Sequence, residues 1–430
     1  MSSNNTSPMS GTTEGGLGMS GEWREVAIRD ICIKIGSGAT PRGGKESYRG
    51  GDTNLIRSQN VYNEGFRTDG LVRIDERQAS ELRNVEVIAG DVLLNITGDS
   101  VARCCTAPMA ILPARVNQHV AIIRTKPEIA DSAFLRYTLV SAQMQDKLMS
   151  MSSAGATRPA LTKGMIERLV VHLPPLPEQR RIAKILGDLD DKIELNRKMN
   201  ETLEQMARAL FKSWFIDFDP VRAKMEGRIP QGMDPETAAL FPSRLVESEL
   251  GIVPEGWEVK KLGDIAELVY GKPLKAEDRR TGPVCVYGAN GIVGVHDEKL
   301  VSGPGIVVGR KGNPGTVTWA HGDFYPIDTT FYVNPNGECR SLLFLYFALY
   351  SSDLSNLSAD SAVPGLNRNH AYMSMQLIPQ TSLVGVFDKH VAPIFASIHY
   401  NESQSRTLAS LRDTLLPQLM RGEGQIPNEK

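Results

Sequence analysis

The chain contains one sequence arrangement twice, and this internal repeat restricts its possible folds more than any other feature. Each half opens with a tryptophan followed at identical intervals by two apolar residues and an aspartate: Trp23, Ile28, Asp30 and Ile31, then Trp257, Leu262, Asp264 and Ile265. Gly90–Gly98 (GDVLLNITG) matches Gly305–Gly312 (GIVVGRKG), and each segment is typical of a buried strand closed by a glycine turn. Two similar modules are expected, because 430 residues also exceed one ordinary core.

Three further matches extend the repeat along each half. Asn117–His119 corresponds to Ile327–Thr329, Phe134–Tyr137 to Leu343–Tyr346, and Arg158–Leu161 to Val363–Leu366. Arg158–Leu161 and Val363–Leu366 are 205 residues apart. The same separation continues into a long apolar pattern after each module. The repeat therefore includes the segments that follow the modules.

The apolar pattern advances by alternating steps of four and three residues, a mean of 3.5 that is typical of a coiled-coil seam. The two seams consist of Ile182, Leu186, Leu189, Ile193, Asn196, Leu203 and Leu210, and of Val391, Ile394, Ile398, Asn401, Leu408 and Leu415. One seam alone would favour an amphipathic helix on its own module, but two in matching register favour helices that pair with each other. Asn196 and Asn401 occupy the same point, where a buried polar pair can fix register. Chain order predicts an antiparallel pair with an approximate two-fold axis, and the first seam covers about 42 Å.

These patterns divide the chain into successive segments. We expect a disordered tail at 1–20, module one at 21–173, a first helix at 174–218, a linker at 219–255, module two at 256–380, a second helix at 381–423 and a tail at 424–430. The fold class is α/β (α+β), with two similar α/β modules separated by a long antiparallel two-helix coiled coil. In the linker, Asp234 is expected to cap a short helix that runs through Val246.

Composition argues against several classes of function. No apolar stretch approaches the roughly 18 to 20 residues that would cross a bilayer, and the polar N-terminal segment lacks the features of a secretory signal, so we expect a cytoplasmic protein. The 5 cysteines include no CxxC pair, which favours reduced structural thiols over a zinc site or disulfides. The net charge of −2 argues against a large basic footprint on DNA, although other subunits can neutralise phosphates on behalf of such a chain.

Sequence signatures of catalysis are weak. Gly38–Glu46 (GATPRGGKE) hints at a phosphate loop, but Glu46 follows the lysine where Ser or Thr is needed. The strings at Asn313 (NPG) and Asn334 (NPN) lack the second proline and the aromatic residue of a base-holding methyltransferase motif. No histidine pair has metal-site spacing. We expect neither a metal nor a cofactor in this chain, and a stand-alone enzyme with unrecognised motifs is the alternative.

Leu173–Val221 (LPPLPEQRRIAKILGDLDDKIELNRKMNETLEQMARALFKSWFIDFDPV) closely resembles the central conserved region of the specificity subunits of type I restriction-modification systems. The second half supports the likeness with Val286–Gly294, Val307–Asn313, Val363–Arg368 and Ser410–Glu423. One departure is Ile378–Lys389 (IPQTSLVGVFDK), where the family usually keeps a PPLPEQ-like start to the helix. We therefore expect that the two surfaces that contact partner subunits can be unequal.

The resemblance implies a DNA-sequence-specificity subunit that is not itself catalytic. Each module would be a target-recognition domain that reads one part of a split, asymmetric site in double-stranded DNA. Two methyltransferase subunits, which bind S-adenosylmethionine, would dock on the helices and methylate adenine N6. Restriction subunits that use ATP and Mg would join them. A coiled-coil scaffold without DNA specificity is a further alternative.

Base readout needs side chains with planar or paired donors and acceptors, on loops that glycine lets approach the duplex. The candidates in module one are Ser37, Thr40, Arg42, Arg57, Gln59, Asn60, Thr157, Arg158 and Lys163. Those in module two are Lys272, Asn290, Arg310, Lys311, Asn313, Asn367 and Arg368. The alternative for each residue is a place in a turn or a solvated charge.

The tryptophans are expected to have structural roles. Trp23 and Trp257 each begin an apolar alternation, which favours core anchors over base-stacking groups. Trp214, Phe215 and Phe218 lie beyond the last seam position of the first helix. For these three, docking of a partner and capping of the helix pair both stay open.

Overall fold

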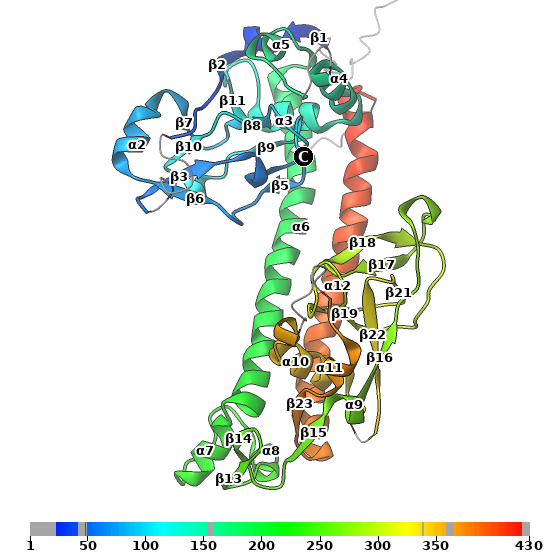
Figure 1. Ribbon diagram of the computed structural model, residues 1–430. Helices are drawn as coiled ribbons and strands as arrows, with labels where there is room; N and C mark the ends of the chain where they lie inside the picture. Colours follow the sequence, from blue (N-terminus) through cyan, green and yellow to red (C-terminus); the bar gives the residue numbers. More distant parts are fainter. Residues whose placement is uncertain are drawn as a thin grey trace, which may run out of the picture. The chain divides into compact units, whose positions relative to one another are not determined.

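The structure is a computed structural model that describes residues 23–41, 48, 50–153, 159–337, 339–357 and 365–423 (Figure 1). The chain forms two compact units, Met1–Ile193 with Arg406–Lys430, and Glu194–Ser405. We call these unit 1 and unit 2. Unit 1 holds module one, and unit 2 holds the linker and module two. Among the described residues, no helix combines the length and the apolar character needed to span a membrane.

Module one is built on two four-stranded sheets. Their strand orders are β2-β11-β8-β9, which is antiparallel throughout, and β6-β3-β10-β7, in which β3 and β10 are parallel. The strands are β1 (Arg24–Ala27), β2 (Cys32–Ser37), β3 (Thr53–Ile56), β4 (Val61–Tyr62), β5 (Gly65–Phe66), β6 (Val72–Ile74), β7 (Glu86–Val87), β8 (Val92–Asn95), β9 (Cys104–Thr106), β10 (Ala114–Val116), β11 (Val120–Thr125) and β12 (Val170–Leu173). The helices are α1 (Ile28–Ile31), α2 (Glu76–Glu81), α3 (Ser132–Val140), α4 (Ala142–Ser153) and α5 (Lys163–Glu167).

Module two repeats this plan with fewer elements. Its strand orders are β16-β22-β19-β20, again antiparallel throughout, and β18-β17-β21, in which β17 and β21 are parallel. The strands are β15 (Glu258–Lys261), β16 (Ala266–Tyr270), β17 (Val284–Gly288), β18 (Gly291–His296), β19 (Gly305–Gly309), β20 (Val317–Ala320), β21 (Phe324–Pro326), β22 (Thr330–Pro335) and β23 (Met375–Ile378). The helices are α9 (Leu262–Ile265), α10 (Leu342–Ser351) and α11 (Arg368–Tyr372).

The internal repeat is confirmed element by element. The strand, short helix and strand that follow Trp23 recur after Trp257, and β1 pairs with β12 as β15 pairs with β23. The helix caps correct one detail of the sequence match. Asp131 caps α3 and Ser341 caps α10, so Phe134 corresponds to Phe344 rather than to Leu343. Both tryptophans pack against apolar cores, although Trp23 is only partly buried.

The linker is more structured than its composition suggests. It contains α7 (Asp219–Met225), α8 (Pro235–Leu240) and the hairpin of β13 (Leu245–Ser248) with β14 (Gly251–Pro254). Asp234 caps α8 by accepting from the N–H of Thr237 at 2.8 Å, as predicted. The helix does not reach Val246, which lies in β13. It ends before Phe241, because a residue that precedes a proline is disfavoured in the helical conformation.

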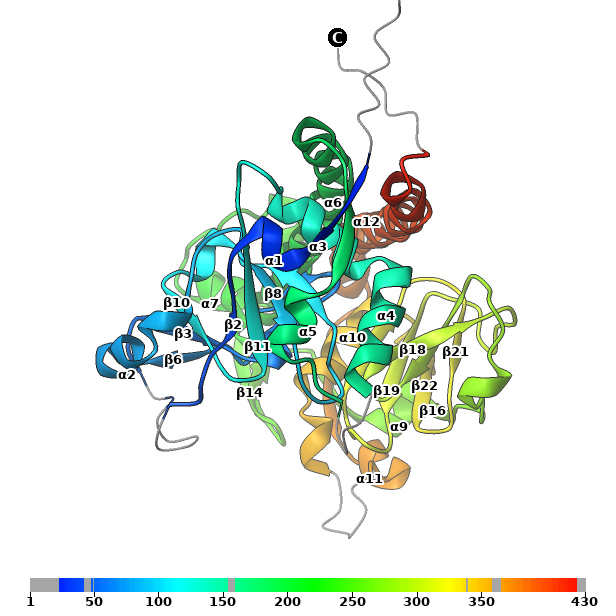
Figure 2. The same cartoon turned by 90° about the horizontal axis from the view of Figure 1, so that it is seen from above.

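Each module leads into a long helix, and the two helices lie side by side in each unit (Figures 1 and 2). They are α6 (Leu176–Phe211), which continues into a π-helical turn (Lys212–Ile216), and α12 (Thr381–Met420). The seam residues that are buried are Ile182, Leu186, Asn196, Val391, Ile398 and Asn401. The remaining seam residues, Leu189, Ile193, Leu203, Leu210, Ile394, Leu408 and Leu415, are half-buried.

Within unit 2, a polar layer fixes the register of the two helices. The side-chain amide of Asn196, which is 0% exposed, donates to Gln404 at 2.9 Å and to Ser405 at 3.2 Å. Asn401 donates to the side chain of Asn200 at 2.9 Å. The predicted asparagine layer therefore exists. The side chains of Asn196 and Asn401 do not bond to each other, because the amide of Asn196 donates to the backbone carbonyl of Asn401, at 3.3 Å. These contacts make the pair antiparallel, since higher numbers in α6 face lower numbers in α12.

Within unit 1, an ion network joins module one to both helices. Asp190 of α6 accepts from Arg136 of α3 at 2.8 Å and from Arg412 of α12 at 2.8 Å. The hydroxyl of Tyr137 donates to the same carboxylate at 2.7 Å. Burial alone would raise the pKa of Asp190, but the two guanidinium groups and the hydroxyl outweigh it and lower this pKa. The carboxylate is therefore charged at neutral pH.

An aromatic cluster ends α6 in unit 2. Trp214 and Phe215 of the π-helical turn are each 5% exposed and pack against Phe387 of α12, with ring centres 6.1 and 5.2 Å apart. Phe218 packs edge-on against Trp257. Of the two roles left open for these aromatics, the structure supports packing at the end of the helix pair.

Candidate nucleic-acid interface

In both modules, three segments meet at one end of the antiparallel four-stranded sheet, which we call the loop end. They are the loop after β2 or β16, the loop after β8 or β19, and the turn before β11 or β22. Isolated bridges tie the second loop to the segment ahead of the short helix, Thr97 to Ala160 in module one and Lys311 to Gly365 in module two. The loop end therefore has the same backbone connections in each module.

Backbone hydrogen bonds establish which residues of the two loop ends are equivalent. The N–H of Ile96 donates to the carbonyl of His119 at 3.0 Å, and the N–H of Arg310 donates to the carbonyl of Thr329 at 2.8 Å. Ile96 and Arg310 thus hold the same backbone position. The modules place different side chains on one scaffold.

The close approach of the first loop requires glycine in both modules. A Cβ atom on Gly38 would collide with the carbonyl oxygen of Val116, and one on Gly271 would collide with those of Pro326 and Ile327. The loop after the first strand therefore packs against the turn before the central strand. This brings the first and third segments of the loop end together.

Two arginines and a tyrosine form the centre of the loop end in module two. The guanidinium carbon of Arg310 lies 4.9 Å from the ring centre of Tyr270, and that of Arg368 lies 5.0 Å from it. Nη1 of Arg310 also donates to the carbonyl of Asp328 at 3.1 Å. These contacts hold both cations against the ring by cation–π attraction and restrict the rotation of Arg310. Tyr270 itself is 44% exposed.

The other candidates of module two surround this centre or support it. Lys272, Lys311 and Asn313 are exposed on loop-end segments, and Asn290 is exposed in the turn between β17 and β18. Asn367 has a structural task, because its side-chain oxygen accepts from the N–H groups of Asn369 and His370 and caps α11.

Hydroxyl, amide and imidazole groups form the loop end of module one. The hydroxyl of Thr40 donates to the side chain of Gln118, whose amide nitrogen lies 3.0 Å from Nε2 of His119. Nδ1 of His119 lies 2.5 Å from the hydroxyl of Thr97. Ser37 is exposed at the last position of β2. This chain of groups can both donate to and accept from base edges.

The turn that contains Arg57, Gln59 and Asn60 adjoins this end, because the buried amide of Asn95 donates to the Ser58 carbonyl at 2.9 Å. Gln59 is exposed, and Arg57 donates to a loop carbonyl at 2.6 Å. Asn60 is 0% exposed, and its amide donates to two backbone carbonyls of the following loop. This corrects the prediction that Asn60 faces DNA, since its hydrogen bonds are used inside the turn.

Of the four remaining candidates of module one, the structure describes only Lys163. Arg42, Thr157 and Arg158 lie outside the described residues. Lys163 is exposed at the start of α5 and lies 3.6 Å from Glu167, one helical turn away. It corresponds to Arg368, because each residue follows the cap of the short helix in its module.

Sequence reasoning missed four residues of the loop ends as candidates: Thr97, Gln118, His119 and Tyr270. The repeat carried a signal for two of them, since Asn117–His119 aligns with Ile327–Thr329 and the residue types differ. No such signal marked Tyr270, whose role depends on arginines that are distant in the sequence. Sequence reasoning also missed a second group of this kind. The ring centre of Tyr62 lies 4.2 Å from the guanidinium carbon of Arg67 and 4.9 Å from that of Arg103.

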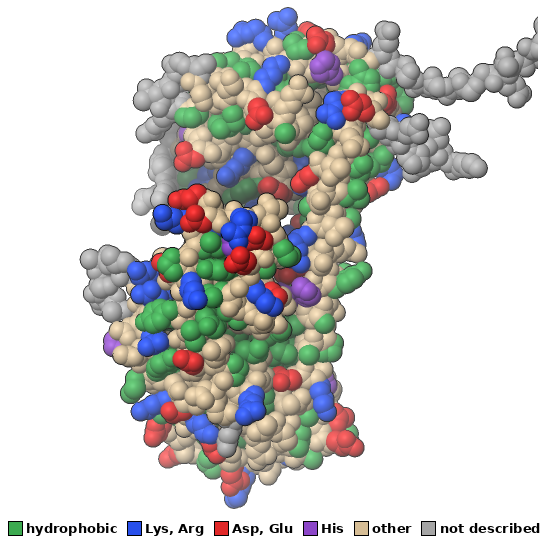
Figure 3. Space-filling model, turned by 90° about the vertical axis from the view of Figure 1, so that its right-hand side faces the viewer, with side chains coloured by type: hydrophobic (Ala, Val, Ile, Leu, Met, Phe, Trp, Pro, Cys, Tyr) green, Lys and Arg blue, Asp and Glu red, His purple; other side chains and the backbone are tan. Residues whose placement is uncertain are grey.

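Charges of both signs are mixed on the surface. On the face drawn in Figure 3, Lys and Arg side chains alternate with Asp and Glu over each unit. This distribution agrees with the net charge of −2. Tight binding to DNA by phosphate attraction alone is not favoured by such a surface.

The buried cysteines have no reactive character. Burial raises the pKa of Cys32 and Cys105 to about 12 and that of Cys339 to about 11, and it also raises the pKa of Cys104. These thiols therefore stay protonated near neutral pH. Within the described ranges, no group of three or more His, Cys, Asp or Glu side chains is placed to hold a metal ion.

Comparison with known proteins identifies the family. A profile described as the type I restriction modification DNA specificity domain matches residues 20–205 and 254–370, more than half of the sequence. The chain belongs to the family of type I restriction-modification specificity subunits. The resemblance noted in Leu173–Val221 is thereby confirmed, together with the mixed α/β fold of two sheet-rich modules.

Individual relatives agree with this assignment. The specificity subunit of the type I restriction enzyme HindI from Haemophilus influenzae is 29% identical over 376 residues, which cover 72% of this chain and 81% of the relative. The specificity subunit of the enzyme MjaIX from Methanocaldococcus jannaschii is 26% identical over 94% of each chain. The crystal structure of a type I S subunit from M. genitalium aligns with a TM-score of 0.55 at 17% identity, over 96% of this chain and 99% of that one. The last likeness shows the fold.

The PPLPEQ segment of this specificity subunit has a structural role in module one. Gln179 is 0% exposed, and its side chain accepts from the N–H of Asp131 at 2.9 Å. Its amide donates to the carbonyls of Ile129 and Pro174, at 3.1 and 2.8 Å. One side chain therefore fastens the start of α6 to the start of α3.

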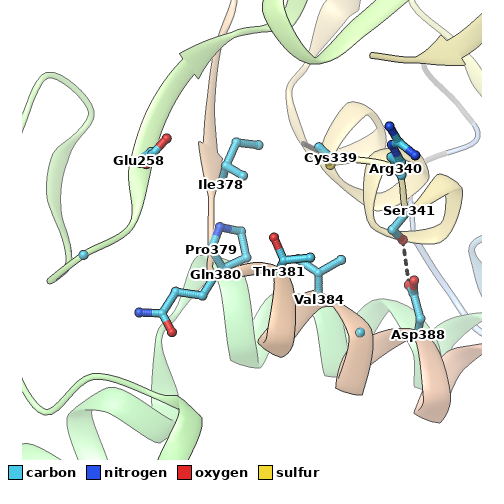
Figure 4. Close-up of a pocket in the computed structure, with 12 residues that line it drawn as sticks. Glu258, Cys339, Arg340, Ser341, Ile378, Pro379, Gln380, Thr381, Val384 and Asp388 are labelled. Carbon is cyan, nitrogen blue, oxygen red and sulfur yellow. Dashed lines mark hydrogen bonds between the residues drawn. The ribbon is translucent and has the colours of Figure 1, made fainter. Parts of the chain in front are cut away.

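Module two has a cavity of about 390 Å³ whose lining includes Val384, the residue that stands where Gln179 stands in module one (Figure 4). At one side of the cavity, the hydroxyl of Ser341 donates to Asp388 at 2.6 Å. Burial raises the pKa of Asp388, and the hydrogen bond from Ser341 offsets part of this effect. The departure from the family pattern in Ile378–Lys389 thus changes how the second helix is fastened to its module.

Proposed function

We propose that this specificity subunit reads a split, asymmetric site in double-stranded DNA, with each module reading one half. The observation that carries the proposal is the loop end, where one backbone arrangement presents hydroxyl, amide and imidazole groups in module one and arginines around a tyrosine in module two. The same loop-end backbone arrangement with different side chains suits two half-sites of different sequence. The subunit lends this specificity to other chains and is not itself catalytic.

The partners in the proposal are two methyltransferase subunits and restriction subunits. The methyltransferase subunits bind S-adenosylmethionine and methylate adenine N6 at the selected site, and the restriction subunits use ATP and Mg. Leu195, Met199 and Met206 of α6, which are 52%, 42% and 55% exposed, support docking on the helices in unit 2. The different fastening of α6 and α12 to their modules supports unequal docking surfaces. A cytoplasmic location follows from the proposed target and partners.

Methylome sequencing of the host with and without the gene for this chain tests the proposal. We expect one split motif, with an adenine in each half, to lose methylation when the chain is absent. Loss of no motif would overturn the proposal. A footprint without sequence preference would identify a scaffold instead.

The purified chain supplies a second test. Incubated with duplex DNA and S-adenosylmethionine or ATP, it should show no turnover until the partner subunits are added. Turnover by the chain alone would show that it is an enzyme in its own right.

A further inference from the structure

We propose that module two reads guanine in its half-site through the guanidinium groups of Arg310 and Arg368. This inference rests on the proposed function, because it assumes that the loop end faces DNA. The two cations share one ring, Tyr270, at distances of 4.9 and 5.0 Å from its centre. A planar guanidinium presents two parallel N–H groups, which match the O6 and N7 acceptors of guanine in the major groove.

The contacts of Arg310 favour base readout over a phosphate contact. Its guanidinium is held by the Asp328 carbonyl at 3.1 Å and by the ring of Tyr270, so its orientation is set before DNA binds. A phosphate can be contacted by lysine or arginine from many directions, whereas the guanine edge needs two parallel donors in one orientation. Lys311, the next residue, is exposed and lies on the same loop, where it is suited to a phosphate.

The backbone around Arg310 also supports direct contact with a base edge. A Cβ atom on Gly309 would collide with the carbonyl of Asn313 and the hydroxyl of Thr316, so the loop after β19 is folded tightly on itself. The bridge between Lys311 and Gly365 holds this loop against the segment that leads to Arg368. In module one the position of Arg310 is held by Ile96, which is 8% exposed and cannot act in this way.

The test compares alanine and lysine variants at both arginines, in the complete chain with its partner subunits, by methylome sequencing. Arg310→Lys and Arg368→Lys keep the charge and remove the planar pair of donors. We expect both lysine variants to relax a guanine position in one half of the motif, with about a tenfold to hundredfold loss of preference, and to leave the other half unchanged. The unchanged half shows that the variant is folded and assembled.

Matched controls separate the possible outcomes. Arg280→Lys alters an exposed arginine of the same module that pairs with Asp297 and Glu298, and it should leave the motif intact. If Arg310→Ala weakens methylation at all sites alike and Arg310→Lys restores it, the group contacts phosphate and the inference fails. It also fails if the affected half contains no guanine, or if both lysine variants keep the motif. Absence of any motif for the unaltered chain would instead remove the proposed function itself.

Discussion

Ile96 and Arg310 hold the same backbone position in the two modules but place different chemistry at the loop end. Ile96 belongs to the core of module one, whereas Arg310 is half-buried against the ring of Tyr270. Module one supplies its polar groups from neighbouring positions, Thr97 and His119. The comparison shows that backbone hydrogen bonds define the scaffold, so the side chains at the loop end can differ without altering it.

The modules also differ in how they hold the helices. Arg136 and Asp190 form an ion network in module one, and their equivalents in module two, Tyr346 and Phe395, belong to an aromatic cluster with ring centres 5.8 Å apart. A buried ion pair fails strongly when one partner is removed, while an aromatic cluster loses contacts one at a time. The two attachments should therefore respond differently to substitution.

The largest effect is expected from Asp190→Ala in module one. Removal of this carboxylate leaves the guanidinium of Arg136, whose side chain is 7% exposed, buried without its partner. We expect a loss of about 3 to 5 kcal/mol in the free energy of unfolding, measured by urea denaturation of the unit 1 transition. The matched variant in unit 2 is Glu204→Ala, which removes a partly exposed partner of Tyr346 and Arg208 and should cost about 1 kcal/mol. Equal losses would contradict the comparison.

Acidification should act through the same carboxylate. The pKa of Asp190 is lower in the folded chain than in the unfolded one, so its stabilising contribution is complete above the unfolded value of about 3.9. That contribution is lost as the pH falls from about 4 through the folded pKa. Asp190→Ala should flatten the acid side of the stability profile, measured by urea midpoints against pH. An unchanged acid dependence would show that other carboxylates dominate.

The next largest effect is expected from Gln179→Val in module one, which introduces the side-chain type that module two has at this position. It removes three hydrogen bonds and leaves the partly buried N–H of Asp131 without its acceptor, so we expect a loss of about 2 to 3 kcal/mol. The reciprocal Val384→Gln places an amide beside an existing cavity and should change stability by less than about 1 kcal/mol. Thermal melting of both variants measures the difference, and a large loss from Val384→Gln would show that the two helix starts are not equivalent.

The periodic and local features of the fold could be predicted from the sequence, while the contacts of the loop ends could not. The repeat predicted two modules, and the spacing around Asn196 predicted a buried seam, because both patterns record regular geometry. The bridge from Thr97 to Ala160 and the cluster at Tyr270 join residues that are distant in the chain, and no period records such contacts. Asn60 was misjudged for the same reason, since the carbonyls that occupy its amide are brought to it by the fold of the turn.

A smaller effect is expected from Asn367→Ala, which separates capping from base readout. Asn367 accepts from two N–H groups, at 2.9 and 3.3 Å, whereas its equivalent Thr162 accepts from one at 3.3 Å. We expect Asn367→Ala to cost about 1 kcal/mol of stability and Thr162→Ala less, with both methylation half-motifs unchanged. Relaxation at a base position other than the guanine assigned to Arg368, the residue after this cap, would return Asn367 to the candidate interface.

An extension of both long helices by one heptad is expected to change the stability and the base reading of each module least. Sequence spacing alone would place the insertions after Leu203 and after Leu408, and the structure corrects these points. Asn200 of α6 contacts Ile398 of α12, so Leu203 and Leu408 lie at different levels of the antiparallel pair. Heptads there would shift the segments between these levels and separate Asn196 from its partners.

Insertions after Ile193 and after Ser405 avoid this damage, because they fall at the boundaries of the two units and leave the contacts within each unit unchanged. One heptad keeps the 3.5-residue period and adds about 10 Å, which equals roughly three base pairs at about 3.4 Å each. If the helices set the separation of the modules, the gap between the half-sites should lengthen by about that amount, while the bases read in each half stay the same. Methylome mapping measures the gap, and a heptad in one helix alone is the control, which should lose stability or assembly because its residues are unmatched. An active double variant with an unchanged gap would show that α6 and α12 are not the spacer.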